Sequence, residues 1–222
     1  MAYKTCVSVA ESSPSKMTST LLKALKKSDY AELRLDFLKP ADVPIALEKT
    51  KSYHKRCVCT LRPKSEGGRF SGTEKERISI LKLIAEYNPY LIDIEFSTLS
   101  KNKPLLKYVK KTGTKILVSW HDFKKTPNTA ALLQRLGKMR RLSRHVKIVT
   151  TANSIRDAAS VLSLYRKHDA NLIAFAMGDH GRATRLLCMS LGSPYTYVSL
   201  GKPVAPGQFS VDEVKSLLAL QK

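Results

Sequence analysis

The chain has 222 residues, 43% of them hydrophobic, so it is long enough to bury one sizeable core and has the composition of an ordinary soluble globular protein. Its 39 Lys and Arg against 18 Asp and Glu give a formal net charge of +21, as in many nucleic-acid-binding proteins. The basic residues are spread along the chain, however, without a Cys/His finger, a basic heptad region or an aromatic RNA-recognition signature, so we interpret them as a solvated surface that steers an anionic metabolite.

Apolar runs that alternate with helical patterns predict the fold. Strands are predicted at residues 4–9, 30–37, 56–62, 90–96, 115–121, 145–150, 171–177 and 195–200. Helices are predicted at residues 15–27, 41–52, 73–87, 100–111, 128–143, 153–168, 182–191 and 210–221. Capping residues stand at several predicted helix starts: Ser13 before Pro14, Thr73 with Glu76, Asn128, Asn153, and Ser210 with Glu213. Eight βα units predict an α/β protein, a closed parallel (β/α)8 TIM barrel forming a single domain over residues 1–222.

The location and the cysteines are predicted from composition. The first strand begins too near the N-terminus to leave room for a signal peptide, and no apolar run approaches a membrane span, so we expect a cytoplasmic protein without membrane contact. Four cysteines without metal-ligand spacing are predicted to be small buried hydrophobes: Cys6, Cys57, Cys59 and Cys188. His54 and His168 are predicted to be surface residues.

Charged residues alternate along the predicted second and fourth strands. Alternate side chains of a barrel strand face the interior, and buried charges must be paired. An internal salt-bridge network that only stabilises the barrel is one reading, and an active site at the carboxyl ends of the strands is the other. We favour the site because a lysine and a histidine lie on neighbouring strands. The residues concerned are Glu32, Arg34 and Asp36 on the second strand, Arg62 at the end of the third, and Asp93 and Glu95 on the fourth.

Lys147 lies in an apolar β-branched run at residues 145–150 that reads as a buried strand. Burial favours the neutral amine, the form that attacks a ketone to make a Schiff base, although a lysine at a strand end can instead extend its stem to solvent. His121 ends the preceding strand, and neighbouring parallel strands lie ~4.8 Å apart, so the imidazole and the amine could share one small substrate. This pair suggests proton abstraction next to an imine.

Short motifs along almost the whole chain carry a family resemblance. They are Glu32-Leu-Arg34-Leu-Asp36, Thr60-Leu-Arg62 with Glu66-Gly-Gly and Phe70-Ser-Gly72, Asp93-Ile-Glu95, Ser119-Trp-His121-Asp-Phe with Thr126-Pro127, Lys147-Ile-Val, Met177-Gly-Asp-His-Gly181 with Thr184-Arg185, Gly192-Ser193, and Ala205-Pro-Gly-Gln208. In this order they resemble the type I 3-dehydroquinate dehydratases. The compact length and the absence of a fused partner resemble archaeal members.

The resemblance implies dehydration of 3-dehydroquinate to 3-dehydroshikimate in the shikimate pathway of aromatic amino acid biosynthesis. Lys147 then resembles the lysine that condenses with the ketone, and His121 resembles the general acid and base. Glu66 resembles the carboxylate that pairs with the histidine. The imine supplies the electron sink, so neither a metal nor another cofactor is expected, and the resemblance implies a homodimer.

The resemblance also implies a substrate-binding set. Arg185 resembles the clamp on the substrate carboxylate, which suits a planar guanidinium. Glu32, Arg34 and Arg62 resemble residues that bind the ring hydroxyls, and Ser8 and Gln208 resemble further polar contacts. Val204 departs from the family pattern, in which a serine often precedes Ala-Pro-Gly-Gln, so one lid hydrogen bond to the substrate is in doubt.

Two alternatives remain open. Another class I Schiff-base barrel of the aldolase type explains Lys147 but not His121, Glu66 and Arg185 together. A basic nucleic-acid-binding module explains only the net charge.

Overall fold

The computed structural model describes residues 3–165 and 171–219. The chain divides into two compact units. The N-terminal unit is Ser8–Val118, and the C-terminal unit is Met1–Val7 together with Ser119–Lys222. The single domain over residues 1–222 remains a prediction.

Within the described residues, the strands make an eight-stranded sheet in the order β7-β6-β5-β4-β3-β2-β1-β8. This alternation of strands and helices in chain order is the element order predicted for a (β/α)8 barrel. The pairs β1–β8, β2–β3, β3–β4 and β6–β7 are parallel. The strands are β1 Thr5–Val9, β2 Tyr30–Arg34, β3 Cys57–Thr60, β4 Leu91–Glu95, β5 Ile116–His121, β6 His145–Thr151, β7 Leu172–Met177 and β8 Thr196–Val198.

A helix follows each strand among the described residues, with the predicted 100–111 helix divided between α4 and α5. The predicted 153–168 helix ends earlier, with a 3-10 turn at Ser163–Tyr165, and its last residues, His168 included, lie outside the described residues. The helices are α1 Pro14–Lys27, α2 Val43–Thr50, α3 Glu74–Glu86, α4 Phe96–Lys101, α5 Lys103–Lys111, α6 Thr129–Arg140, α7 Ile155–Leu162, α8 Thr184–Ser190 and α9 Val211–Ala219.

Most predicted caps are confirmed. Thr73 and Glu76 form a reciprocal capping box, and Asn128 accepts from the Ala131 N–H at 2.9 Å. The prediction for α7 was wrong by one residue. Ser154 caps this helix because its hydroxyl accepts from the Asp157 N–H at 3.2 Å, whereas the Asn153 backbone N–H donates to the Asp157 carboxylate at 2.9 Å.

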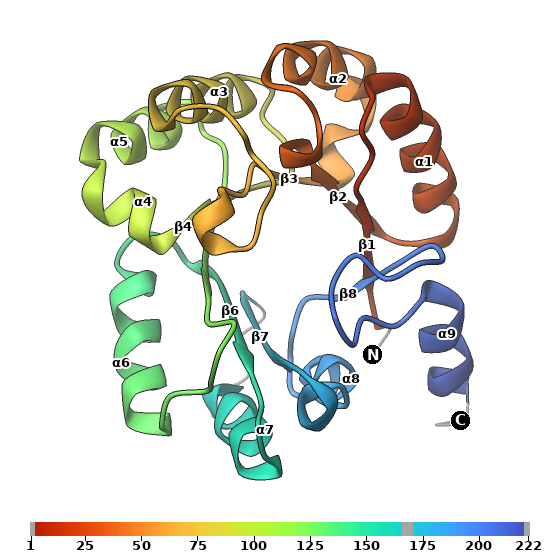
Figure 1. Cartoon of the computed structure of the whole chain (residues 1–222), viewed down its shortest axis with the longest axis vertical. Coiled ribbons are helices and arrows are strands. Elements are labelled where there is room, and N and C mark those ends of the chain that lie inside the picture. Colours follow the sequence, from red (N-terminus) through yellow and green to blue (C-terminus); the bar gives the residue numbers. More distant parts are fainter. Residues whose placement is uncertain (1–2, 166–170, 220–222) are drawn as a thin grey trace. The chain divides into compact units, whose positions relative to one another are not determined.

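In the N-terminal unit, register separates an apolar face from a polar one. Leu33 pairs with Cys59, and Cys59 with Ile92, so these three buried side chains share the face covered by helices. Arg34, Thr60 and Asp93 are paired in the same way on the opposite face. Helices α1, α2, α3 and α5 follow one another around the outside of these strands (Figure 1).

The end of β2 differs from the prediction. The strand stops at Arg34, and Leu35–Phe37 forms a 3-10 turn, so Asp36 does not continue the alternation of Glu32 and Arg34 along the strand. The turn instead brings the Asp36 carboxylate back to the Arg34 guanidinium at 2.7 and 2.8 Å. The two side chains still lie together, but through an ion pair across a turn.

In the C-terminal unit, β6 and β7 pair over six residues, with Lys147 opposite Ile173 and Thr151 opposite Met177. Strand β8 pairs with β1, where Tyr197 lies opposite Cys6. Helices α6, α7 and α8 pack in sequence along this unit (Figure 1).

The four cysteines are free and buried, as predicted. Burial raises the pKa of Cys57 and of Cys188 to about 12, so both thiols stay protonated at neutral pH. His54 was wrongly predicted to lie at the surface. It is 2% exposed because the 3-10 turn Lys51–Arg56 directs its ring inward, where Nε2 lies 3.0 Å from the Thr50 hydroxyl.

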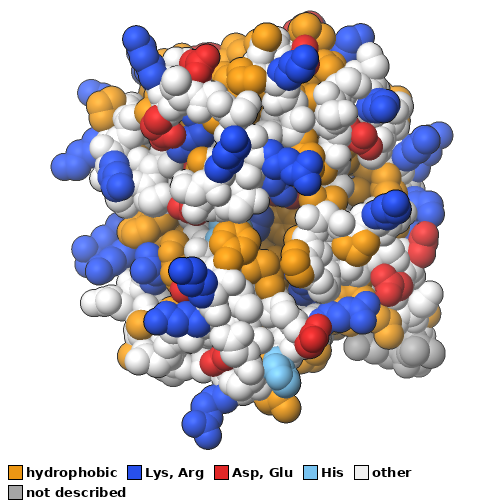
Figure 2. All heavy atoms as spheres, viewed as in Figure 1, with side chains coloured by type: hydrophobic (Ala, Val, Ile, Leu, Met, Phe, Trp, Pro, Cys, Tyr) orange, Lys and Arg blue, Asp and Glu red, His pale blue; other side chains and the backbone are white. Residues whose placement is uncertain are grey.

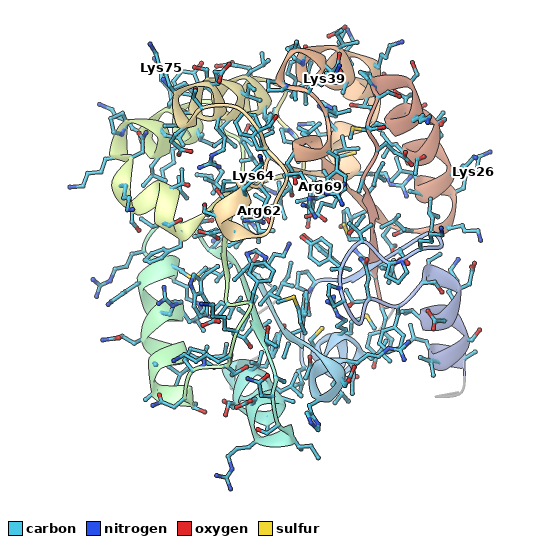
Figure 3. The ribbon with its side chains drawn as sticks, in the orientation of Figure 1. Lys26, Lys39, Arg62, Lys64, Arg69 and Lys75 are labelled. Atoms are coloured by element: carbon cyan, nitrogen blue, oxygen red, sulfur yellow. The ribbon has the colours of Figure 1, made fainter. Side chains whose placement is uncertain are left out.

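Basic side chains are scattered over the face shown in Figure 2, separated by neutral and acidic ones, and they do not merge into one patch. Lys26 and Lys75 project from the outside of the N-terminal unit, whereas Arg62 lies inside it among the strand ends (Figure 3). Across the part of the chain that the structure describes, no helix is both long and apolar enough to cross a membrane.

Candidate active site

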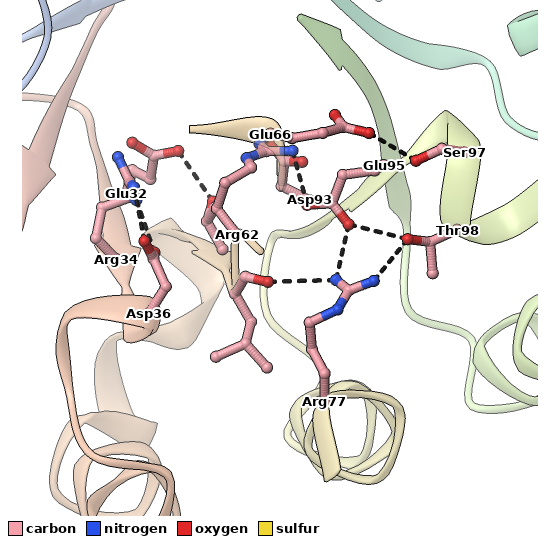
Figure 4. Close-up of polar contacts among 12 residues, drawn as sticks. Glu32, Arg34, Asp36, Arg62, Glu66, Arg77, Asp93, Glu95, Ser97 and Thr98 are labelled. Carbon is pink, nitrogen blue, oxygen red and sulfur yellow. Dashed lines mark hydrogen bonds and ion pairs between the residues drawn. The ribbon is translucent and has the colours of Figure 1, made fainter. Parts of the chain in front are cut away.

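Arg62 is the centre of a buried ion-pair cluster in the N-terminal unit (Figures 3 and 4). It follows β3 and is 4% exposed. Its Nη2 lies 2.8 Å from Asp93 Oδ2, and its Nη1 lies 2.8 Å from Glu95 Oε1. Both carboxylates come from β4 and are fully buried. Although burial lowers the pKa of Arg62, these two carboxylates raise it above its ordinary value, so Arg62 is a permanently charged and rigidly held cation.

Arg77 supports this cluster from α3 and was not predicted as a functional residue. Its side chain is almost fully buried, and its Nη1 lies 2.8 Å from Glu95 Oε2, the oxygen that Arg62 does not use. Its Nη2 donates to the Thr98 hydroxyl at 2.6 Å (Figure 4). Its Nε lies 2.8 Å from Glu74 Oε2. A sequence signal for it exists, because Arg77, Leu81 and Ile84 are spaced to share one helix face.

Glu32 lies beside the cluster on β2 and is 4% exposed. Its Oε1 accepts from the Thr60 hydroxyl at 2.9 Å, and its Oε2 accepts from the Ser8 hydroxyl at 3.1 Å. Ser8, predicted as a substrate contact, is therefore also a partner of Glu32.

The Arg34 guanidinium carbon lies 5.0 Å from the centre of the Phe37 ring. The Arg34–Asp36 pair raises the pKa of Arg34 despite the opposing effect of its burial.

Glu66 lies in the 3-10 turn Lys64–Glu66 and is half-buried. Gly67 follows with φ 76°, and a Cβ on Gly68 would lie 2.1 Å from the Arg62 carbonyl oxygen, so this turn requires glycine at both positions. Glu66 Oε1 accepts from the Ser97 hydroxyl at 2.6 Å (Figure 4). Burial raises the pKa of Glu66.

Lys147 and His121 belong to the C-terminal unit. Lys147 is 6% exposed in β6, between the fully buried Val146 and Ile148, as expected for a lysine within a strand. Its Nζ lies 4.0 Å from the centre of the Tyr197 ring. His121 is the last residue of β5 and is half-buried, with its ring stacked on Phe123 at 5.9 Å between centroids.

Arg185 differs from the arginines of the N-terminal unit. It is 2% exposed in α8, with Nη2 donating to the Pro206 carbonyl at 2.9 Å and Cζ 4.4 Å from the centre of the Phe175 ring. Among the described residues no carboxylate pairs with it, and its buried Nε has no hydrogen-bond partner. Burial lowers the pKa of Arg185 to about 10, so it remains charged at neutral pH. An incoming anion would supply the missing counter-charge.

Gln208 lies in the loop between β8 and α9 and is 4% exposed. Its side-chain oxygen accepts from the Val204 N–H at 2.9 Å, and its own N–H donates to the Ala205 carbonyl at 3.2 Å. This loop is therefore closed on itself through Gln208.

Over residues 3–165 and 171–219, no group of three or more His, Cys, Asp or Glu side chains is arranged to hold a metal ion.

Comparison with known proteins identifies the family. The model of the type I 3-dehydroquinase family matches residues 5–222. The chain belongs to the type I 3-dehydroquinase family. The 3-dehydroquinate dehydratase of Methanocaldococcus jannaschii is 36% identical over 218 residues, 97% of each chain. The family resemblance and the prediction of a 3-dehydroquinase, a hydro-lyase, are confirmed.

Solved structures agree with this type I 3-dehydroquinase assignment. The 3-dehydroquinate dehydratase of Geobacillus kaustophilus has a TM-score of 0.89 at 24% identity and covers 99% of this chain and 91% of its own. The type I 3-dehydroquinate dehydratase of Clostridium difficile has a TM-score of 0.85 at 26% identity, covering 99% and 92%. The predicted (β/α)8 barrel class is confirmed.

The Arg77 contacts predict a large stability effect. Replacing Arg77 with Met leaves one oxygen of the buried Glu95 carboxylate without its cation, so the free energy of unfolding should fall by about 3–5 kcal/mol. Urea unfolding measures this. The control is Lys75→Met on the exposed side of the same helix, which should change stability by less than about 0.5 kcal/mol. Equal effects of the two substitutions would contradict the role given to Arg77.

Proposed function

We propose that the chain dehydrates 3-dehydroquinate to 3-dehydroshikimate in the shikimate pathway through an imine on Lys147. The observation that carries this proposal is the buried position of Lys147 in β6, with Nζ against the Tyr197 ring, within the family motif Lys147-Ile-Val. The amine of a lysine is the nucleophile that condenses with a ketone to form an imine.

The reaction removes one water overall. The Lys147 amine adds to the ketone carbon and water leaves, which forms a protonated imine that withdraws electrons from the neighbouring carbon. His121 takes a proton from that carbon, and the resulting electron pair expels the hydroxyl from the next carbon along. His121 returns its proton to the departing hydroxyl, and one imidazole can do both because its ordinary pKa lies near neutral pH. Hydrolysis of the product imine consumes one water and frees the lysine.

We assign the supporting roles by the family motifs. Glu66 orients His121 and stabilises its charged form. Arg185 binds the substrate carboxylate, because it is buried and charged and no described carboxylate compensates it. Arg62 already holds two carboxylates, so it suits a hydroxyl better than a second anion. The ring hydroxyls are assigned to Glu32, Arg34 and Arg62, with further polar contacts from Ser8 and Gln208.

The remaining expectations belong to the same proposal. We infer a cytoplasmic homodimer with one catalytic domain that needs no metal or other cofactor, on the strength of the family resemblance and of the imine chemistry. Light scattering on the full chain tests the dimer.

The first functional prediction concerns the imine. Borohydride reduction in the presence of 3-dehydroquinate should leave a covalent adduct on Lys147, found by peptide mass spectrometry. Lys147→Ala should lose both the adduct and turnover, because the amine that makes the imine is gone. An adduct on Lys115 or Lys202 in the wild-type protein would refute the assignment.

The second concerns the clamp. Arg185→Ala should reduce kcat/KM by roughly 2–5 kcal/mol of transition-state stabilisation, because it removes a buried charge-assisted contact. Arg156→Ala, an exposed arginine on α7, is the control. In the wild-type protein, affinity for shikimate-like carboxylates should fall as pH rises through about 10, where Arg185 loses its proton. Unchanged carboxylate affinity in Arg185→Ala would show that the carboxylate is bound elsewhere and would refute the role given to Arg185.

The third separates the acid–base group from its partner. His121→Ala should lose on the order of 10²–10⁴ in turnover, the usual span for a general acid–base residue. A borohydride-trappable adduct should accumulate, because Lys147 still forms an imine whose hydrolysis is slow without proton transfer. Glu66→Gln should be milder and should alter the pH profile of kcat. If Glu66→Gln were the more damaging change, the base would be a carboxylate.

A further inference from the structure

Ser97 is an exposed residue in the first turn of α4, directly after β4. It is not part of the predicted site, yet its hydroxyl reaches Glu66 on the turn after β3 with a 2.6 Å hydrogen bond (Figure 4). We propose that Ser97 is a positioning residue for the dehydration, holding the Glu66 carboxylate in the arrangement in which it acts on His121. This inference rests on the role proposed above for Glu66.

The backbone around Glu66 is already rigid. The Glu66 N–H and the Gly68 N–H both donate to the Pro63 carbonyl, at 3.1 and 3.0 Å, and the Phe70 N–H donates to the Arg62 carbonyl at 3.3 Å. These bonds hold the turn against the end of β3 but leave the side-chain torsions of Glu66 unset. A glutamate has three such torsions, and ordering them costs free energy. The Ser97 hydroxyl supplies a contact at the far end of the side chain, from a different element.

The charges around Glu66 explain why a donor is needed there. Within the N-terminal unit, Glu66 faces the Arg62 cation from the end of β3 and the Asp93 and Glu95 carboxylates from β4. Burial is the largest influence on the pKa of Glu66 and raises it, and both carboxylates raise it further. The Ser97 hydrogen bond is the largest influence that lowers it, ahead of Arg62. Ser97 therefore favours the charged form of Glu66 that can stabilise an imidazolium.

Ser97 can be changed without disturbing the core. It borders a cavity of about 330 Å³ that is also lined by Ser65, Arg77 and Thr98. Removing the hydroxyl oxygen at this exposed position enlarges a space already open to water and creates no buried void. Substitution of Ser97 should therefore leave the stability of the unit unchanged, whereas substitution of Arg77 is expected to lower it.

The test is the pH dependence of kcat in Ser97→Ala. A carboxyl whose pKa rises is protonated at higher pH, so the acidic limb of the profile should move upward by about one pH unit. The alkaline side and the Lys147 adduct should be unchanged. Ser97→Thr keeps the hydroxyl and should restore the wild-type profile. Ser100→Ala, exposed on the same helix, is the matched control and should leave the profile in place.

A second background shows whether Ser97 acts through Glu66. In Glu66→Gln, adding Ser97→Ala should have no further effect on the profile, because there is no carboxyl left to tune. An unshifted profile in Ser97→Ala, or a full additional shift in the Glu66→Gln background, would overturn the inference while leaving the proposed function intact. A wild-type profile in Glu66→Gln itself would instead remove the role of Glu66, and that of Ser97 with it.

Discussion

The buried pairing of Arg62 with Asp93 and Glu95 is the constraint on which the N-terminal half of the proposed site depends. Two carboxylates with no exposed surface are stable only where cations match them, because an unpaired buried charge costs several kcal/mol. Arg62 neutralises one charge and Arg77 the other, which gives two cations for two anions. A slip of one residue between β3 and β4 would turn both carboxylates to the helix-covered face. The ion pairs therefore define the register as well as the site.

Four of the buried or partly buried arginines, Arg34, Arg62, Arg77 and Arg185, divide into two kinds. Arg34, Arg62 and Arg77 each have carboxylate partners within 2.8 Å, and these partners keep the guanidinium groups in place. Within the part of the chain that the structure describes, the Arg185 guanidinium contacts only a carbonyl oxygen and the face of an aromatic ring. The first kind is rigid before any ligand arrives, whereas Arg185 carries an electrostatic cost that a ligand can relieve. Buried arginines thus form structural ion pairs in the N-terminal unit, whereas the buried arginine of the C-terminal unit is the proposed ligand-binding residue.

The sequence predicted what depends on periodicity and local chemistry. Apolar runs located every strand to within a few residues, and the Thr73–Glu76 box located the start of α3. The 3-10 turn after Arg34 escaped prediction because the alternation of Glu32, Arg34 and Asp36 fits a strand equally well, and only the ion pair selects the turn. The prediction for His54 was wrong for a similar reason, since its burial depends on the Thr50 hydroxyl one turn earlier and on the packing of Tyr87.

Arg77 and Ser97 were missed because their roles arise from tertiary contact alone. In the sequence, Arg77 follows Glu74 by three residues, a spacing typical of an exposed helical ion pair. Ser97 is an ordinary polar residue in a short helix. The sequence around Arg77 does not indicate that the next strand carries a buried carboxylate. The sequence around Ser97 does not indicate that a distant turn carries Glu66. Residues that support a site from a neighbouring element are the class that a single sequence reveals least.

The uncompensated charge of Arg185 has a consequence for discrimination between ligands. In the proposed reaction, the carboxylate is present before and after the water leaves, so a clamp on that group stabilises substrate, intermediates and product alike. Such uniform binding captures the metabolite but does not by itself speed the chemical step, and it retains the product as well. Release of the product then depends on the contacts to the hydroxyl that leaves, because the product no longer makes them. Discrimination between substrate and product would reside in the residues of the N-terminal unit that are proposed to bind hydroxyls, not in the strongest electrostatic contact.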